Sequence, residues 1–197
     1  MSKSDPSSSK KERNKTIRWV ITIFFVTIFI SSFISFISNE IMAVSTIFVA
    51  FIILLLIVLI GILFDVIGVA VTSADEKPFH SMAARKVPGA QESIKLLRNA
   101  EKVSSICNDV VGDICGVVSG SASAAIAAQV IDKFAFSWPM WVSLLMSALV
   151  AGLTVGGKAV GKTFAIHSCT GIVELVGKFI WGIHHISALF QIRKNNS

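Results

Sequence analysis

Oxygen-bearing side chains interrupt two long apolar stretches of this sequence. One stretch, GILFDVIGVAV, contains a single carboxylate at Asp65. The other, VSSICNDVVGDICG, gathers hydroxyl, amide and carboxylate groups: Ser104, Ser105, Asn108, Asp109 and Asp113. Oxygens of these kinds are the ligands that a hard cation such as Mg²⁺ prefers, whereas a soft metal would need thiolates or imidazoles. The residue types therefore predict a hard-cation site if the two stretches lie side by side.

Helical spacing sorts the polar residues of the second stretch into two rows. Residues four apart share one face of a helix, so Ser105, Asp109 and Asp113 form one row. The row beside it consists of small or amide side chains: Ser104, Asn108, Gly112, Gly116 and Gly120. Glycines at this GxxxG spacing let helix backbones approach closely. Such packing would explain the glycines but not the acids.

The composition indicates a membrane protein. Of the 197 residues 53% are hydrophobic, and the mean hydropathy is +0.74. A helix needs roughly 20 mostly apolar residues to cross a bilayer. Four segments meet this length: 19–38, 43–74, 103–131 and 138–157. The fold class predicted from them is all-α, a polytopic membrane helix bundle with about four transmembrane helices.

Basic residues alternate between the two sides of these spans. Residues 1–18 hold six Lys or Arg and residues 73–103 hold six more, while the short links at 39–40 and 132–137 hold only Lys133. Because cytoplasmic loops carry the excess of Lys and Arg, we expect a multi-pass protein of the cell membrane with both termini in the cytoplasm. This pattern accounts for the net charge of +6 without nucleic-acid binding. The polar, Ser-rich residues 1–18 predict a disordered basic tail.

Two further segments are expected at the membrane surface. Apolar residues recur at three-residue steps over 90–102, which predicts a short amphipathic helix on the cytoplasmic face. The largely apolar segment 160–190 is expected to form interfacial helices and not to cross the membrane a fifth time. A fifth crossing would carry Arg193 and Lys194 to the outside, against the charge pattern. The last residues, 191–197, are a polar tail.

The acids within the spans need compensation. A carboxylate inside a bilayer costs about 2.5 kcal/mol or more, so it faces the protein interior, a partner or an ion. The spans that carry Asp65 and the row of Asp109 and Asp113 meet the same cytoplasmic loop, so these side chains lie at similar heights and can converge on a cation. The alternative is structural, because Lys158 and Lys162 lie four residues apart at the cytoplasmic end of the next span and could neutralise the acids.

Catalytic chemistry is not expected. The sequence contains no nucleophile elbow, phosphate loop, HExxH motif or CxxC framework. The three cysteines, Cys107, Cys115 and Cys169, are expected to be small buried hydrophobic residues. His184 and His185 are adjacent and would point about 100° apart on a helix, which is poor geometry for one shared metal. The protein is therefore not predicted to be an enzyme.

Three segments resemble the transmembrane domain of the cyclin M and CorB/CorC magnesium and cobalt transporters. The segment FDVIGVAVTSADEKPFHSMAARK resembles the family's first core helix, EKVSSICNDVVGDICG its second, and TVGGKAVGKTFAIHS the end of its third. The motifs are individually loose but agree in order and spacing over about residues 44–190. On this comparison, residues 19–38 are an extra helix in front of a transporter-like domain, 41–190. The sequence carries none of the family's CBS domains.

The resemblance implies a site at particular positions. The family's cation-binding Ser falls on Asp65, and its second-helix Ser and Asn fall on Ser104 and Asn108. Its second Asn falls on Gly112, which has no side chain to offer. In the third-helix motif, the family's Glu and Pro are replaced and its Lys is retained: Gly157, Gly161 and Lys162. The resemblance implies a homodimer in the lipid bilayer that carries Mg²⁺.

Two functional hypotheses follow from the sequence. In the first, the protein binds and transports a divalent cation, magnesium or cobalt, between two core helices. Its ligands would come from this set: Asp65, Ser104, Asn108, Asp109, Ser105, Asp113 and Gly112. In the alternative, the protein is a non-transporting membrane scaffold or regulatory protein with the same fold, and its acids are paired structurally with lysines.

Overall fold

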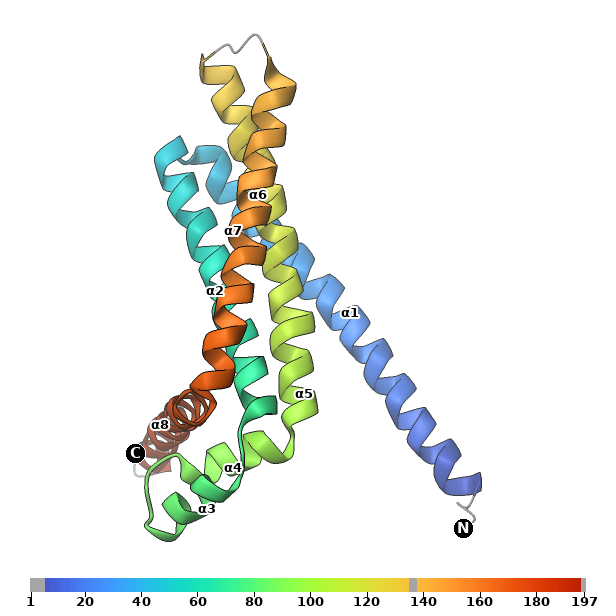
Figure 1. Cartoon of the computed structure of the whole chain (residues 1–197), viewed down its shortest axis with the longest axis vertical. Helices are drawn as coiled ribbons and strands as arrows, with labels where there is room; N and C mark the ends of the chain where they lie inside the picture. The colour runs from blue at the N-terminus through green and yellow to red at the C-terminus, as the bar shows by residue number, and fades with distance from the viewer. Residues whose placement is uncertain (1–5, 135–137, 196–197) are drawn as a thin grey trace.

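The computed structural model describes residues 6–134 and 138–195, and these residues form helices and no strand (Figure 1). The predicted all-α class is confirmed. A π-helical turn at Ile106–Gly112 joins α5 to α6 without a break in the rod. In chain order the α-helices are α1 (Pro6–Val44), α2 (Ile47–Ser73), α3 (Lys77–Ala84), α4 (Ala90–Arg98), α5 (Ala100–Ser105), α6 (Asp113–Phe134), α7 (Pro139–His167) and α8 (Cys169–Asn195).

Four of the described helical segments are long and apolar enough to cross a membrane. They are Ile17–Ser38, Ile47–Ser73, Ala100–Phe134 and Pro139–His167. The predicted membrane helix bundle of about four spans is confirmed at this level. The last segment was predicted to end at 157 because Lys158 and Lys162 lower the hydropathy after that residue. The helix itself continues for ten more residues, to His167, since no proline follows to stop it.

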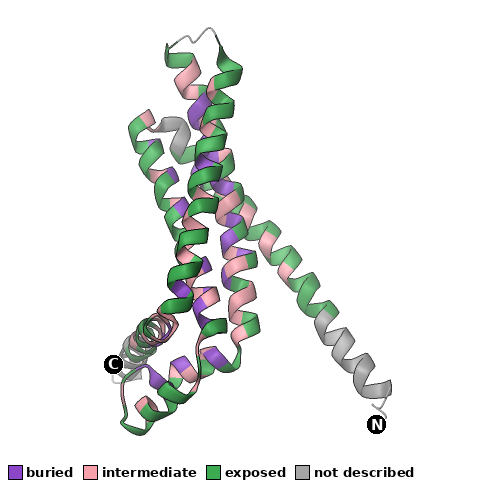
Figure 2. Cartoon of the chain, viewed as in Figure 1, coloured by how far each residue is buried: buried purple, intermediate pink, exposed green. Residues whose placement is uncertain are grey.

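Helices α2, α6 and α7 pack against one another, and α1 packs against α6. Figure 2 shows buried residues where the three helices face each other and exposed residues around the outside. The described part of α1 crosses the others at an angle, and its most apolar window is 0% buried (Figure 1). A bundle with apolar residues on its outer surface suits a lipid environment, where the solvent itself is apolar. One core cluster joins the three helices: Ala50, Leu54, Val58, Ala122, Ile126 and Val150.

The remaining helices form a base at one end of the bundle. Helices α3 and α4 and the start of α8 lie there, at the same end as the beginning of α1 (Figure 1). Helix α8 packs against α4 so closely that a β-carbon on Gly177 would overlap the Ser93 Oγ. That hydroxyl lies 3.1 Å from the Val173 carbonyl oxygen. The short contacts fix α8 across the base, and α8 is not among the described segments suited to crossing a membrane.

The base differs in detail from the prediction. The amphipathic helix predicted over 90–102 is divided at Asn99, so that α4 lies in the base and α5 begins the third span. The eight-residue helix α3 was not predicted, because a segment this short has too few residues to show periodicity. The structure also has helix from Pro6, where a disordered tail was expected over 1–18, and helix to Asn195 within the expected polar tail. Lys, Glu and Arg in KKER favour helix next to an apolar span, which accounts for the first extension.

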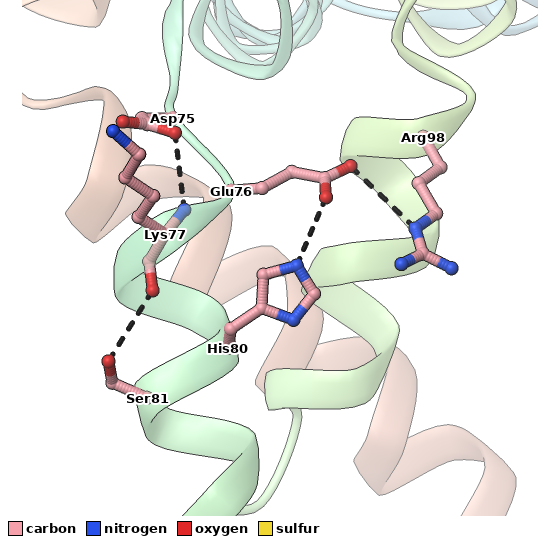
Figure 3. A network of polar contacts seen from close by, with 6 residues as sticks. All are labelled: Asp75, Glu76, Lys77, His80, Ser81 and Arg98. Carbon is pink, nitrogen blue, oxygen red and sulfur yellow. Dashed lines mark hydrogen bonds and ion pairs between the residues drawn. The ribbon is translucent and has the colours of Figure 1, made fainter.

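A polar network joins α3 to the end of α4 (Figure 3). The Glu76 carboxylate lies 3.2 Å from the His80 Nε2 and 3.7 Å from the Arg98 Nε. At the start of α3, the Lys77 backbone N–H donates to the Asp75 carboxylate at 3.2 Å. These side chains are substantially exposed, and ion pairs of this kind contribute little to stability. The network orients the base and does not form its core.

Two glycines of α7 allow close approach to α2, but they are not the row predicted. A β-carbon on Gly161 would lie 2.7 Å from the Val66 Cγ2, and one on Gly157 would overlap the Ile62 side chain. By contrast, β-carbons on Gly116 and Gly120 would meet no atom within 4 Å. The close contact is therefore between α7 and α2, while part of the predicted glycine row on α6 has no described neighbour.

Replacing Gly161 should separate α7 from α2. In Gly161→Ala the new methyl group presses on Val66, and overpacking of this kind costs about 1–3 kcal/mol. We expect a lower thermal unfolding midpoint in detergent. The matched control is Gly156→Ala on the same helix, where the methyl group meets no atom within 4 Å. Equal midpoints for the two variants would contradict the glycine-mediated contact.

Candidate functional site

Asp65 lies on the inward face of α2 and is 4% exposed. Its two carboxylate oxygens face two lysines of α7. The Lys158 Nζ lies 3.9 Å from Oδ1, and the Lys162 Nζ lies 3.9 Å from Oδ2. Both distances exceed hydrogen-bond length, so the lysines compensate the charge without satisfying the oxygens. The buried Oδ2 has no hydrogen-bond partner among the described residues.

The glycines of α7 explain why the lysines reach Asp65. Gly157 and Gly161 bring the backbone of α7 against α2, and each is followed directly by a lysine. Lys158 is the more enclosed of the two, with its side chain 22% exposed against 54% for Lys162. The short GxxxG pattern in VGGKAVGK therefore does two things: it closes the helix contact and places two ammonium groups beside a buried carboxylate.

Asn108 approaches α2 beside Asp65. Its Nδ2 donates to the Ser104 Oγ at 3.2 Å, one turn earlier on the same rod. Its Oδ1 is buried and has no hydrogen-bond partner among the described residues. A β-carbon on Gly68 would overlap this oxygen, so Asn108 fits only because position 68 has no side chain. Since Gly68 follows Asp65 by three residues on one helix face, Asn108 and Asp65 are neighbours along α2.

The π-helical turn decides which polar residues face inward. Such single turns insert an extra residue into a helix and are frequent at functional sites. Here the turn presents the buried Gly112 toward α7, where its β-carbon would lie 3.4 Å from the Lys158 Nζ. Lys158 is thus near both the π-helical turn and Asp65. We call the five polar residues gathered here the polar centre: Asp65, Ser104, Asn108, Lys158 and Lys162.

The structure does not bring the other two carboxylates to the polar centre. Asp109 and Asp113 are exposed, and Ser105 in the same row is only half-buried. The described residues contain no group of three or more His, Cys, Asp or Glu side chains that could hold a metal. The predicted convergence of the three acids is therefore not found. The reason is angular, because Asp109 follows the inward-facing Asn108 by one residue and therefore lies on the neighbouring face of the rod, which is exposed.

The polar centre can be assessed as a cation site from its charges and its oxygens. One carboxylate faces two ammonium groups, so the charge on Asp65 is already compensated. Two acceptor oxygens, Asp65 Oδ2 and Asn108 Oδ1, are nevertheless buried without donors. Donor-free acceptors from two helices suit a cation, whereas the lysines suit a structural ion pair. Both chemistries predicted from the sequence thus meet at one place.

Sequence reasoning missed the packing role of two glycines of the site. Gly68 provides the space that Asn108 occupies, and Gly161 helps bring Lys162 to Asp65. The signal for Gly161 was present as a GxxxG spacing with Gly157 on α7. Gly68 had no comparable signal, because only the neighbouring helix shows what fills its missing side chain.

Comparison of the chain with family models, with curated proteins and with solved structures gives no match. The resemblance to the cyclin M and CorB/CorC transporters remains a prediction from the motifs.

Filling the space at Gly68 should expel Asn108 from α2. We expect Gly68→Ala to lower the thermal unfolding midpoint, because the methyl group overlaps a buried side chain. In the double variant Gly68→Ala with Asn108→Ala the overlap is gone. Its destabilisation should therefore be smaller than the sum of the two single effects by about 0.5–3 kcal/mol, as expected for residues in contact. Strict additivity in this double-mutant cycle would show that the two positions do not touch.

Proposed function

We propose that this protein binds a divalent cation at the polar centre and moves it across the membrane. The observation that supports the proposal is the pair of buried, donor-free oxygens on Asp65 and Asn108. A buried acceptor without a partner costs about 1–3 kcal/mol. A cation between α2 and the π-helical turn would offset this cost at both atoms, which a lysine at 3.9 Å does not do.

The ligand set of the proposed site is smaller than the set predicted from sequence. It consists of the Asp65 carboxylate, the Asn108 carbonyl and the Ser104 hydroxyl. Mg²⁺ dehydrates reluctantly and usually keeps several waters, so a few protein oxygens are sufficient for it. Asp109, Asp113 and Ser105 lie on the neighbouring face of the rod, and Gly112 has no side chain. These four positions are not part of the proposed site.

We propose a topology with both termini and the base in the cytoplasm. The basic residues of 6–18 and the six of 73–103 belong to segments at one end of the bundle (Figure 1). Cytoplasmic segments carry such an excess. Asp65 lies eight residues before the end of α2, so the site would be nearer to the cytoplasmic surface than to the outer one.

The second candidate function is a non-transporting membrane scaffold. The ion pairs of Asp65 with Lys158 and Lys162 favour it, because they leave no uncompensated negative charge for a cation to neutralise. A buried ion pair that loses one partner is strongly destabilising. In this reading the lysines hold α7 against α2, and the polar centre has no ligand.

Magnesium should stabilise the protein against heat if the first proposal is right. A ligand present at 100 times its dissociation constant stabilises the folded state by about 2.7 kcal/mol. We expect the unfolding midpoint of purified protein to rise with Mg²⁺ and this increment to disappear in Asp65→Asn. The matched control is Asp132→Asn, an exposed acid near the opposite end of α6. A wild-type unfolding midpoint that does not change with Mg²⁺ would contradict the proposal of cation binding.

Transport is tested separately from binding. We expect proteoliposomes with wild-type protein to take up Mg²⁺ along a gradient, and the Asp65→Asn and Asn108→Ala variants to lose at least about nine-tenths of this flux, as expected when about 1.4 kcal/mol or more of interaction is removed. The Asp132→Asn variant should transport like wild type. Magnesium-dependent stabilisation without flux would support the proposed cation site and contradict the proposed transport.

Neutralising a lysine separates the two candidate functions. In Lys158→Met a positive charge near Asp65 is lost, so a cation should bind more tightly and the magnesium-dependent rise in midpoint should grow. Under the scaffold alternative the same variant should only be destabilised, and Mg²⁺ should restore nothing. The measurement is the unfolding midpoint with and without Mg²⁺, compared with Lys133→Met at the far end of α6, a matched lysine outside the polar centre.

A further inference from the structure

Helix α8 carries a row of large apolar side chains that the described chain leaves uncovered. Leu175, Phe179 and Ile183 follow one another at four-residue steps and are 69%, 68% and 51% exposed. The side of α8 that packs against α4 is different, because Val173 and Gly177 are buried there. One side of α8 is therefore fixed to the base, and another side is apolar and exposed.

The contacts of α8 place it at the end of the membrane spans. Val173 shares a core cluster with Ala70 and Val71 of α2 and with Ala165 of α7. These three residues lie in the last turns of two long apolar segments, and α8 crosses that end of the bundle (Figure 1). An amphipathic helix at this level buries its apolar side about 5–10 Å into the boundary between headgroups and acyl chains. The side of α8 that faces α4 then lies at the level of the lipid headgroups.

A pocket of about 290 Å³ opens where the turn between α3 and α4 meets α8. Lys86 lines it from the turn and Trp181 lines it from α8. Trp181 follows Gly177 by four residues, so it lies on the side of α8 that faces α4. Its ring stacks on that of His185, with the centroids 5.0 Å apart, and this contact fixes one wall. Tryptophan is typical of the membrane surface, where its ring lies at headgroup level.

The unpaired charge at this pocket is positive. Lys86 and the adjacent Arg85 are exposed, and neither side chain has an ion pair or hydrogen bond among the described residues. Glu92 also lines the pocket, but its carboxylate lies 3.9 Å from the Lys95 Nζ. Two cations without an acid thus lie beside one acid that already has a base.

Lys86 has a backbone conformation that glycine adopts more readily. Its φ is 56°, and it is the only non-glycine residue with a positive φ in the described part of the chain. The Lys86 N–H donates to the Ala83 carbonyl and the Val87 N–H to the Met82 carbonyl, both at 3.0 Å. This pattern closes many helices, with glycine as the usual residue at the position of Lys86. Residues held in such conformations gather at functional sites, which directs attention to the Lys86 side chain.

We propose that this pocket binds the phosphate group of an anionic phospholipid. Phosphate oxygens accept charge-assisted hydrogen bonds from the Lys86 ammonium group, and Arg85 adds a second positive charge. Trp181 packs beside the headgroup, while the apolar row of α8 holds the pocket at phosphate level. Basic pockets beside membrane spans bind anionic headgroups in this way. The inference goes beyond cation transport and does not depend on it.

Lipid retention by the purified full-length protein tests the site. We load the protein with equal amounts of phosphatidylglycerol and phosphatidylcholine of identical acyl chains and count the retained lipids by native mass spectrometry. Phosphatidylglycerol should be preferred, and Lys86→Gln should reduce the preference about fivefold, the factor that one lysine contributes near an anionic lipid surface. The matched control is Lys77→Gln, an exposed lysine at the other end of α3 and outside the pocket lining, which should keep the preference.

A second variant separates lipid binding from a structural role of the lysine. Glycine adopts a positive φ without steric cost, so Lys86→Gly should unfold in neutral detergent at a temperature at least as high as that of the wild type. Its preference for phosphatidylglycerol should nevertheless fall as in Lys86→Gln. Loss of the preference together with a lower unfolding midpoint in both variants would indicate a structural lysine and overturn the proposal.

Three further outcomes would contradict the lipid site. Equal retention of the two lipids by the wild type would show that the pocket does not select an anionic headgroup. A wild-type preference in both Lys86 variants would show that the selection takes place elsewhere. Displacement of phosphatidylglycerol by millimolar inorganic phosphate would identify free phosphate as the occupant, whereas we expect inorganic phosphate to leave the bound lipid in place.

Discussion

A buried carboxylate next to two lysines is the constraint on which the polar centre depends. Asp65 stands inside an apolar span, where an uncompensated charge is costly, so positive charge must reach it. Lys158 and Lys162 do so from α7, and they can because Gly157 and Gly161 bring that helix onto α2. Packing and electrostatics are therefore coupled: a side chain at either glycine would widen the helix contact and move both ammonium groups away from Asp65.

The π-helical turn sets the other half of the polar centre. It directs Asn108 into the space that a side chain at position 68 would fill, and it leaves Asp109 on the outer surface. As a result one acceptor oxygen of α2 and one of the third span are buried together without donors. Unsatisfied acceptors in a low-dielectric setting are destabilising, and they persist in native proteins chiefly where a ligand, an ion or water has a role. This is why the proposed cation function depends on two atoms and not on the number of acids.

The outward residues of the third span raise a separate requirement. Asp113 is exposed on a helix face that also carries open glycines, and its compensation is not found within the described protomer's polar centre. A membrane gives such a face only lipid or protein as neighbours. The inward carboxylate of Asp65, by contrast, is compensated within the chain by Lys158 and Lys162. The surroundings of each acid thus depend on the helix face on which it lies.

Composition and charge determined the class of this protein: an all-helical membrane bundle with four long apolar segments and a base helix rich in polar residues. These properties are local, since hydropathy and helical period can be read from neighbouring residues. The sequence also named Lys158 and Lys162 as partners for an acid. Only the tertiary structure decided that Asp65 is that acid, that Asp109 and Asp113 are excluded, and that Gly68 and Gly161 make the contacts. Those outcomes depend on how each helix is rotated and on the distance between helices. Both are set by contacts between side chains that are far apart in the sequence.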